Sequence, residues 1–138
     1  GLFIASAGNS GTNNDAAPIY PASYTSGNIL SVAAIDPYHT LARFSNYGFE
    51  SVDIAAPGTG ILSLDLQGGY TPKNGTSMSA PHVAGAAALL KAYMPALSAS
   101  TIKNIILSSA VKIPSLAGKV LTGGALDVNA MFELANRL

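Results

Sequence analysis

A serine stands directly before an alanine-rich run, in the segment Gly75-Thr76-Ser77-Met78-Ser79-Ala80-Pro81. The residues that follow, Ala84–Leu90, favour a helix, and Pro81 is tolerated in its first turn, where N–H groups have no intrahelical partner. Thr76 or Ser77 is therefore predicted near the N-cap, with Ser77 at the positive end of the helix dipole. An alkoxide or oxyanion would be stabilised there. Taken alone, Gly-Thr-Ser is also compatible with a plain Ser/Thr cap on a buried helix.

A second polar segment, Ser6-Ala7-Gly8-Asn9-Ser10-Gly11, follows a short apolar run. The Asn9 side-chain amide could donate a hydrogen bond to a developing negative oxygen. By itself, however, Gly-Asn-Ser-Gly is good turn chemistry, and a turn is the better interpretation of the tetrapeptide in isolation. Only the two segments together favour a catalytic role.

Six segments spread over nearly the whole chain resemble the subtilisin-like serine proteases (subtilases). They are Ser6–Gly11, Asn28–Asp36, Phe44–Gly48, Val52–Gly58, Gly75–Gly85 and Gly123–Ala130. The resemblance implies that Ser77 is the nucleophile of an endopeptidase with polypeptide substrates. It also implies that Asn9 and the Ser77 N–H hold the oxyanion of the tetrahedral intermediate.

The subtilase triad runs along the chain in the order Asp, His, Ser. In the family the aspartate and histidine precede the oxyanion asparagine, whereas this chain begins at Gly1, directly in the strand before Asn9. We therefore expect residues 1–138 to be the C-terminal portion of a subtilase catalytic domain, a single incomplete domain. An N-terminal half, in the same or a separate chain, would supply Asp and His, and the isolated chain is predicted to be inactive. The alternative is a non-catalytic subunit or pseudoprotease that acts in packing or peptide binding.

The two histidines do not complete a triad in this interpretation. His82 lies five positions after Ser77, about 140° around the helix at 100° per residue, and does not easily reach the hydroxyl. The family has a structural histidine at that position, so core or interface packing is expected. His39 is expected to be exposed in a polar loop, and a triad of His39, Asp53 and Ser77 is a minor alternative. An α/β-hydrolase is disfavoured, because no histidine follows His82.

Two further sites are implied by the resemblance. Ala5, Ser6, Ala7 and Gly8 would form one wall of the substrate pocket and Phe44 would lie near its base, although core packing explains both equally well. The loop around Ala22 and Tyr24 would bind structural calcium or a monovalent cation together with Asp53. Hard cations do take carbonyl and carboxylate oxygens. Asp53 alternatively caps a turn, and no cofactor is required for the chemistry itself.

The composition narrows the classes of partner. Charged residues make up 10% of the chain, the net charge is zero and there is no cysteine. We therefore expect no nucleic-acid partner, no disulfide and no thiolate metal site. No apolar run approaches the ~20 residues that span a bilayer, so no membrane partner is expected. Secretion to the extracellular space is implied by the family resemblance alone.

The predicted elements indicate an α/β fold with a mainly parallel sheet packed with helices, a partial subtilisin-like fold. Continuous apolar runs predict buried strands, and caps predict helices. The strands are expected at 2–5, 29–35, 52–55 and 61–64, with an irregular arm to residue 73; the helices are expected from about 78 to 93, after Ser98, and from Asp127 to about 136. The segment 2–5 is the predicted free edge of the sheet, because the absent strands would precede it.

Overall fold

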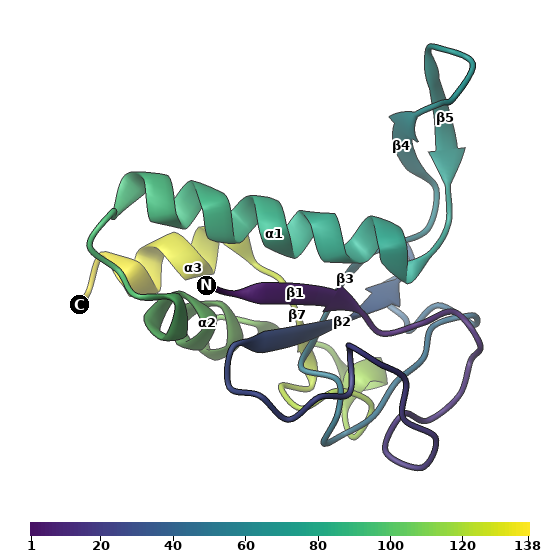
Figure 1. Ribbon diagram of the computed structural model, residues 1–138, viewed down its shortest axis with the longest axis horizontal. Coiled ribbons are helices and arrows are strands. Elements are labelled where there is room, and N and C mark those ends of the chain that lie inside the picture. The colour runs from purple at the N-terminus through teal and green to yellow at the C-terminus, as the bar shows by residue number, and fades with distance from the viewer.

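The computed structural model describes all 138 residues, with five strands in one sheet and two in a separate hairpin (Figure 1). The sheet contains β1 (Phe3–Ser6), β2 (Ile29–Ile35), β3 (Ile54–Pro57), β6 (Val111–Lys112) and β7 (Gly124–Ala125), and the hairpin contains β4 (Ile61–Leu64) and β5 (Tyr70–Lys73). The helices are α1 (Thr76–Tyr93), α2 (Ala99–Ser108) and α3 (Val128–Ala135), with one 3-10 turn at Pro114–Leu116.

The strand order is β1-β2-β3-β7-β6. The first three pairings are parallel, and only β6 runs antiparallel to its neighbour β7. The predicted α/β class with a mainly parallel sheet is therefore confirmed. The predicted edge is confirmed as well, because β1 pairs with β2 on one side and with no strand on the other.

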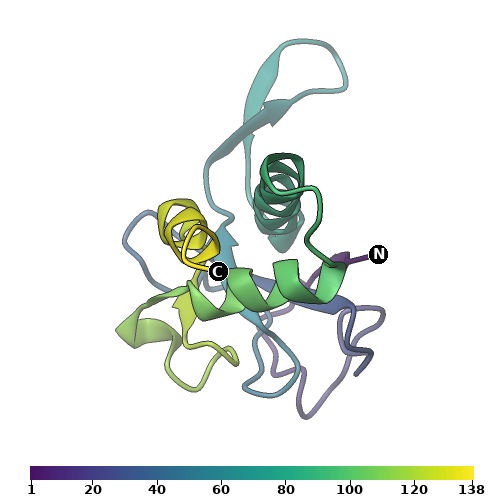
Figure 2. The same cartoon turned by 90° about the vertical axis from the view of Figure 1, so that its left-hand side faces the viewer.

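Strand β2 is buried on both faces of the sheet, which explains why it is a mostly apolar run rather than an alternating one. Leu30 and Val32 of β2 pack with the three helices, whereas Ala33 and Ile35 pack against the segment that contains Leu116. Figure 2 shows the three helices gathered on one side of the sheet and the loops on the other. The loops that follow the carboxyl ends of β1 and β3 lie near the start of α1.

Helix caps predicted from single residues are confirmed at two places. The Ser98 hydroxyl accepts the N–H of Thr101 at 3.1 Å, and Asp127 accepts the N–H of Ala130 at 2.9 Å. These caps act within one turn, so the local sequence suffices to predict them.

Four expectations were wrong in detail. Strands β6 and β7 were not predicted, since two residues carry no periodicity. The third strand lies two residues later than expected. The strand predicted at 61–64 is confirmed as β4, but the arm to residue 73 is not irregular. It contains β5, which pairs antiparallel with β4 in a hairpin that projects beyond the start of α1 (Figure 1). Helix α1 begins at Thr76 instead of about Met78, with Gly75 as the N-cap and no side-chain cap of its own.

Candidate active site

Helix α1 begins at a glycine whose backbone few other residues could adopt. Gly75 has φ 152° and ψ 158°, a combination nearly restricted to glycine. Ser77 is the second residue of the helix, and its side chain is exposed. The Ser77 N–H lies in the first turn, where no intrahelical carbonyl is available to accept it. Both the hydroxyl and the N–H of Ser77 are therefore free to meet a ligand.

The cap that α1 lacks locally comes from a distant loop. Asn9 Oδ1 accepts the Thr76 N–H at 2.9 Å and the Thr76 hydroxyl at 2.8 Å, and Thr76 Oγ1 in turn accepts the Gly8 N–H at 3.2 Å. A backbone N–H can only donate, so the Asn9 atom that faces it must be the amide oxygen. The orientation of the Asn9 amide is thereby fixed, and its NH2 group makes no hydrogen bond within the chain.

Two free donors border the same small space beside Ser77. A methyl group placed on Gly75 would lie 3.7 Å from Asn9 Nδ2 and 3.7 Å from the Ser77 backbone nitrogen. The Met78 sulfur would lie 3.5 Å from the same point. Two N–H donors at the positive end of an 18-residue helix can stabilise a negatively charged oxygen. The structure thus brings the two predicted catalytic residues, Ser77 and Asn9, together.

The loop that carries Asn9 is held by two buried asparagines. Asn46 Oδ1 accepts the Ser10 N–H at 2.8 Å, and Asn46 Nδ2 donates to Asn14 Oδ1 at 2.9 Å. Asn14 Nδ2 donates to the Ala7 carbonyl at 2.8 Å. Sequence reasoning did not assign these positioning roles, because a buried asparagine has no periodic pattern. The one signal was that Asn46 lies in a segment that carried the family resemblance.

Gly8 allows this packing. Its φ is +112°, and a Cβ there would lie 2.6 Å from both Asn46 Nδ2 and Ile19 Cδ1. Any side chain at this position would be strained and would push against the asparagine network. The chain bends at Asn9–Gly11, and the glycine at position 8 leaves room for the asparagine network beside it.

Neither histidine is hydrogen-bonded to Ser77, although His82 and Ser77 line the same pocket. His82 Nδ1 is hydrogen-bonded to the Met78 carbonyl at 2.7 Å, and its ring is exposed rather than in the core. His39 lies in an exposed turn with φ 59°. Asp53 and Ser77 line different pockets, and neither pocket includes His39. The structure does not bring the alternative triad of His39, Asp53 and Ser77 together.

The residues proposed for substrate binding do not form a single pocket within this chain. Ala5 and Ala7 are buried, with Ala7 in the core beneath the sheet, so only their backbone could face a substrate. Ser6, Gly8 and Phe44 are partly exposed. The segment Ala5–Gly8 and Phe44 line no common cavity in this chain.

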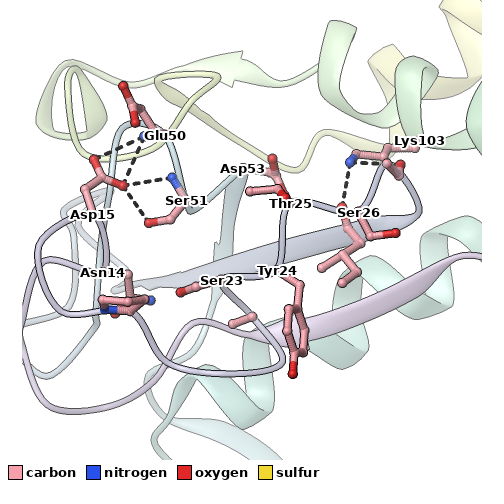
Figure 3. A pocket seen from close by; sticks show the side chains of 14 residues that line it. Asn14, Asp15, Ser23, Tyr24, Thr25, Ser26, Glu50, Ser51, Asp53 and Lys103 are labelled. Carbon is pink, nitrogen blue, oxygen red and sulfur yellow. Dashed lines mark hydrogen bonds between the residues drawn. The ribbon is translucent and has the colours of Figure 1, made fainter.

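The three residues of the expected cation site do line one pocket, of about 380 Å³ (Figure 3). These are Ala22, Tyr24 and Asp53, and Lys103 of α2 joins them. Burial raises the pKa of the Asp53 carboxyl, against the hydrogen bond from the Ser31 N–H and the positive charge of Lys103, which both lower it. Lys103 was not part of the sequence expectation, since nothing local links it to that loop. No group of three or more His, Cys, Asp or Glu side chains in the chain is arranged to hold a metal ion.

The structure is an α/β fold in which two N–H donors without partners lie beside a serine at a helix N-terminus. The chain belongs to the subtilase family, whose model matches residues 1–131. It is 43% identical over 113 residues to subtilisin DY of Bacillus licheniformis, and the aligned region covers 81% of this chain and 40% of that protein. It is 42% identical over 136 residues to subtilisin BL of Lederbergia lenta, and the aligned region covers 99% of this chain and 46% of that protein.

Solved structures give the same fold. A chain from the subtilase cytotoxin SubAB assembly superposes with a TM-score of 0.87 at 29% identity, over 99% of this chain and 49% of that chain. A protease from Pseudoalteromonas arctica superposes with a TM-score of 0.84 at 31% identity, over 97% and 42%. The chain thus spans less than half the length of the curated relatives described here. None of its helices has the length and apolar character needed to cross a membrane.

Proposed function

We propose that this chain is the C-terminal portion of a subtilase catalytic domain and supplies the nucleophile and the oxyanion hole for peptide-bond hydrolysis. The observation that supports this most strongly is the contact between Asn9 and Thr76. It fixes the Asn9 amide so that its free NH2 and the Ser77 N–H border the same space. A donor pair held in place before the reaction costs no reorganisation in the transition state.

In this mechanism the Ser77 hydroxyl attacks the scissile carbonyl and forms a C–O bond. Its proton passes to a histidine of the N-terminal half, because a serine hydroxyl is a weak nucleophile until a base removes its proton. Asn9 Nδ2 and the Ser77 N–H donate to the oxyanion of the tetrahedral intermediate. The C–N bond then breaks, the histidine protonates the leaving amine, and water hydrolyses the acyl-enzyme on Ser77.

The N-terminal half is proposed to dock on the free edge of β1. Beside this edge lies an apolar cavity of about 540 Å³, lined by β1, α1 and the start of α2, with Ile4, Ala84, Ala88 and Ile102 among its residues. Phe3 of β1 is half exposed, and an unpaired strand with apolar neighbours favours pairing with another chain. A complete α/β subtilase domain would continue the sheet at this edge.

Reconstitution tests the proposal directly. The chain alone should neither turn over a chromogenic peptide nor react rapidly with a fluorophosphonate, since it lacks a base for Ser77. Addition or co-expression of the N-terminal half should restore both, and Ser77→Ala should abolish both. Failure of the assembled wild-type protein to label at Ser77 would refute the peptidase proposal and favour a subunit that acts in packing or peptide binding. Turnover by the chain alone, lost in Ser77→Ala, would refute the need for a partner.

Polypeptide substrates and an extracellular location are part of the same proposal and rest on family membership. The chemistry described above needs no metal or organic cofactor, because every proton transfer and charge is assigned to a side chain or backbone group. Detection of the protein in the culture medium of its source, against a cytosolic marker, would test the location.

A further inference from the structure

Lys103 reaches from α2 across to the first residue of β2 and the loop that precedes it. Its ammonium donates to the Ile29 carbonyl at 2.5 Å and to the Gly27 carbonyl at 3.2 Å. Figure 3 shows these contacts at one end of the pocket and Asp53 between them and Asp15. Lys103 lies 74 positions from Ile29 along the chain, so this contact depends on the tertiary fold.

The surroundings of this ammonium have the chemistry of a cation site. Two backbone carbonyls accept from it, and the partly buried carboxylate of Asp53 lines the same pocket. Asp53 Oδ2 also accepts the Ser31 N–H at 2.7 Å. Carbonyl and carboxylate oxygens are the ligands that calcium and the monovalent cations take. A lysine ammonium is a compact point charge that can occupy such a position.

The other carboxylates on this pocket are Asp15 and Glu50. Asp15 lies at the other end of the pocket. Its carboxylate oxygens accept hydrogen bonds from the N–H groups of Glu50 and Ser51 and from the Ser51 hydroxyl. Glu50 donates its backbone N–H to Asp15, and Glu50 itself is exposed to solvent. Lys103 is the only basic residue on the pocket. It is thus the one positive charge available to the carbonyls and to Asp53.

We propose that the Lys103 ammonium, held by the Gly27 and Ile29 carbonyls, is the built-in cation of the pocket that Ala22, Tyr24 and Asp53 line, and that it takes the place of a calcium or monovalent ion there. With the ammonium in place this pocket does not fit an added metal ion, because the Gly27 and Ile29 carbonyls are engaged and a second positive charge would be repelled. The loop before β2 is then fixed to α2 without any free cation. Removal of the charge exposes a latent cation site that depends on Asp53.

The test compares wild type with Lys103→Met, which removes the charge and keeps an unbranched side chain. It is made on the full 138-residue chain, bound to its N-terminal half if the two are isolated together. Calcium chloride and terbium serve as the probes, with the unfolding temperature and terbium luminescence as readouts. Wild type should bind no terbium and should unfold at the same temperature with and without calcium. Lys103→Met should unfold at a lower temperature, and saturating calcium should raise that temperature by roughly 5 °C.

Lys91 offers a matched control. Its ammonium also donates to two carbonyls, Pro95 at 2.6 Å and Leu97 at 2.8 Å, on a pocket without any carboxylate. Lys91→Met should therefore gain no calcium response. The response of Lys103→Met should vanish when Asp53→Asn is added, because the latent site needs the carboxylate.

Two results would overturn the proposal. One is calcium stabilisation or terbium binding in wild type that Asp53→Asn abolishes, which would mean that the ammonium leaves the cation position open. The other is a folded Lys103→Met protein with no calcium response. If Lys103→Met does not fold, terbium binding to wild type and to Asp53→Asn still decides: binding lost in Asp53→Asn refutes the proposal, and its absence from both supports it. The readouts are independent of the proposed peptidase activity.

Discussion

Replacement of Asn9 by Asp separates the two roles that its side chain has in the structure. The amide oxygen caps α1 by accepting two hydrogen bonds from Thr76, and the amide NH2 faces the space beside Ser77. Aspartate keeps the acceptor and loses the donor, whereas alanine loses both. Both variants should therefore lose catalytic activity, but only alanine should lose the stability that the cap provides.

The stability difference follows from the cap. Asn9→Ala leaves the Thr76 N–H without a partner and should lower the free energy of unfolding by about 1–2 kcal/mol, the usual effect of losing a helix N-cap. Asn9→Asp should stay within about 0.5 kcal/mol of wild type, since a carboxylate at a helix N-terminus is favoured by the dipole. Thr76→Val should lower the free energy of unfolding by less than Asn9→Ala does, because the hydrogen bond from the backbone N–H of residue 76 to Asn9 survives.

The catalytic effect follows from the donor. In the assembled protease, turnover should fall about 10²–10³-fold in Asn9→Ala, the magnitude known for loss of the oxyanion asparagine of the relative subtilisin. Asn9→Asp should fall further still, because a carboxylate repels the oxyanion. KM should change little, since the hydrogen bond forms mainly in the transition state.

The assay pairs chromogenic-peptide kinetics of the assembled protein with thermal unfolding of each variant. Fluorophosphonate titration corrects the kinetics for the fraction of active protein. Wild-type turnover in Asn9→Asp would remove Asn9 from the oxyanion hole. Equal destabilisation in Asn9→Asp and Asn9→Ala would show that the Asn9–Thr76 contact does not cap the helix in solution.

Three further predictions concern single residues. Met78 lies beside the oxyanion space, so mild peroxide should inactivate the assembled protease and Met78→Ala should resist it; equal loss in both would identify another target. Gly8→Ala places a Cβ 2.6 Å from Asn46 Nδ2 at φ +112° and should destabilise the fold by about 2 kcal/mol or more in a denaturant titration, whereas an unchanged midpoint would contradict the strain argument. The pKa of Asp15 is lowered: its burial opposes ionisation, but the hydrogen bonds from Ser51 and neighbouring N–H groups outweigh it. Its contribution to stability is therefore present above the unfolded pKa near 4 and is lost as the pH falls through the lower folded pKa, so acid unfolding of Asp15→Asn should be shallower.

The local features of this protein could be predicted from its sequence. Ser98 and Asp127 cap the helices that they precede, and an apolar run forms the buried strand β2. The strand predicted at 2–5 forms as β1, but it is only partly buried, because it lies at the free edge of the sheet. The placement of Ser77 at a helix N-terminus also followed from residues within one turn of it. Such features depend on contacts between near neighbours, which the order of residues specifies directly.

Other features depended on which distant segments the fold brings together. Asn9 caps a helix that begins 67 positions later, and Lys103 binds a loop 74 positions earlier. The strands β6 and β7 exist because each finds a partner in the sheet, since two residues have no strand signal of their own. A single side-chain hydrogen bond across such a separation leaves no periodic pattern in the chain. Packing of the sheet against α1 and α2 decides which of these long-range hydrogen bonds form. The same packing sets the orientation of the Asn9 amide and the position of the Lys103 charge.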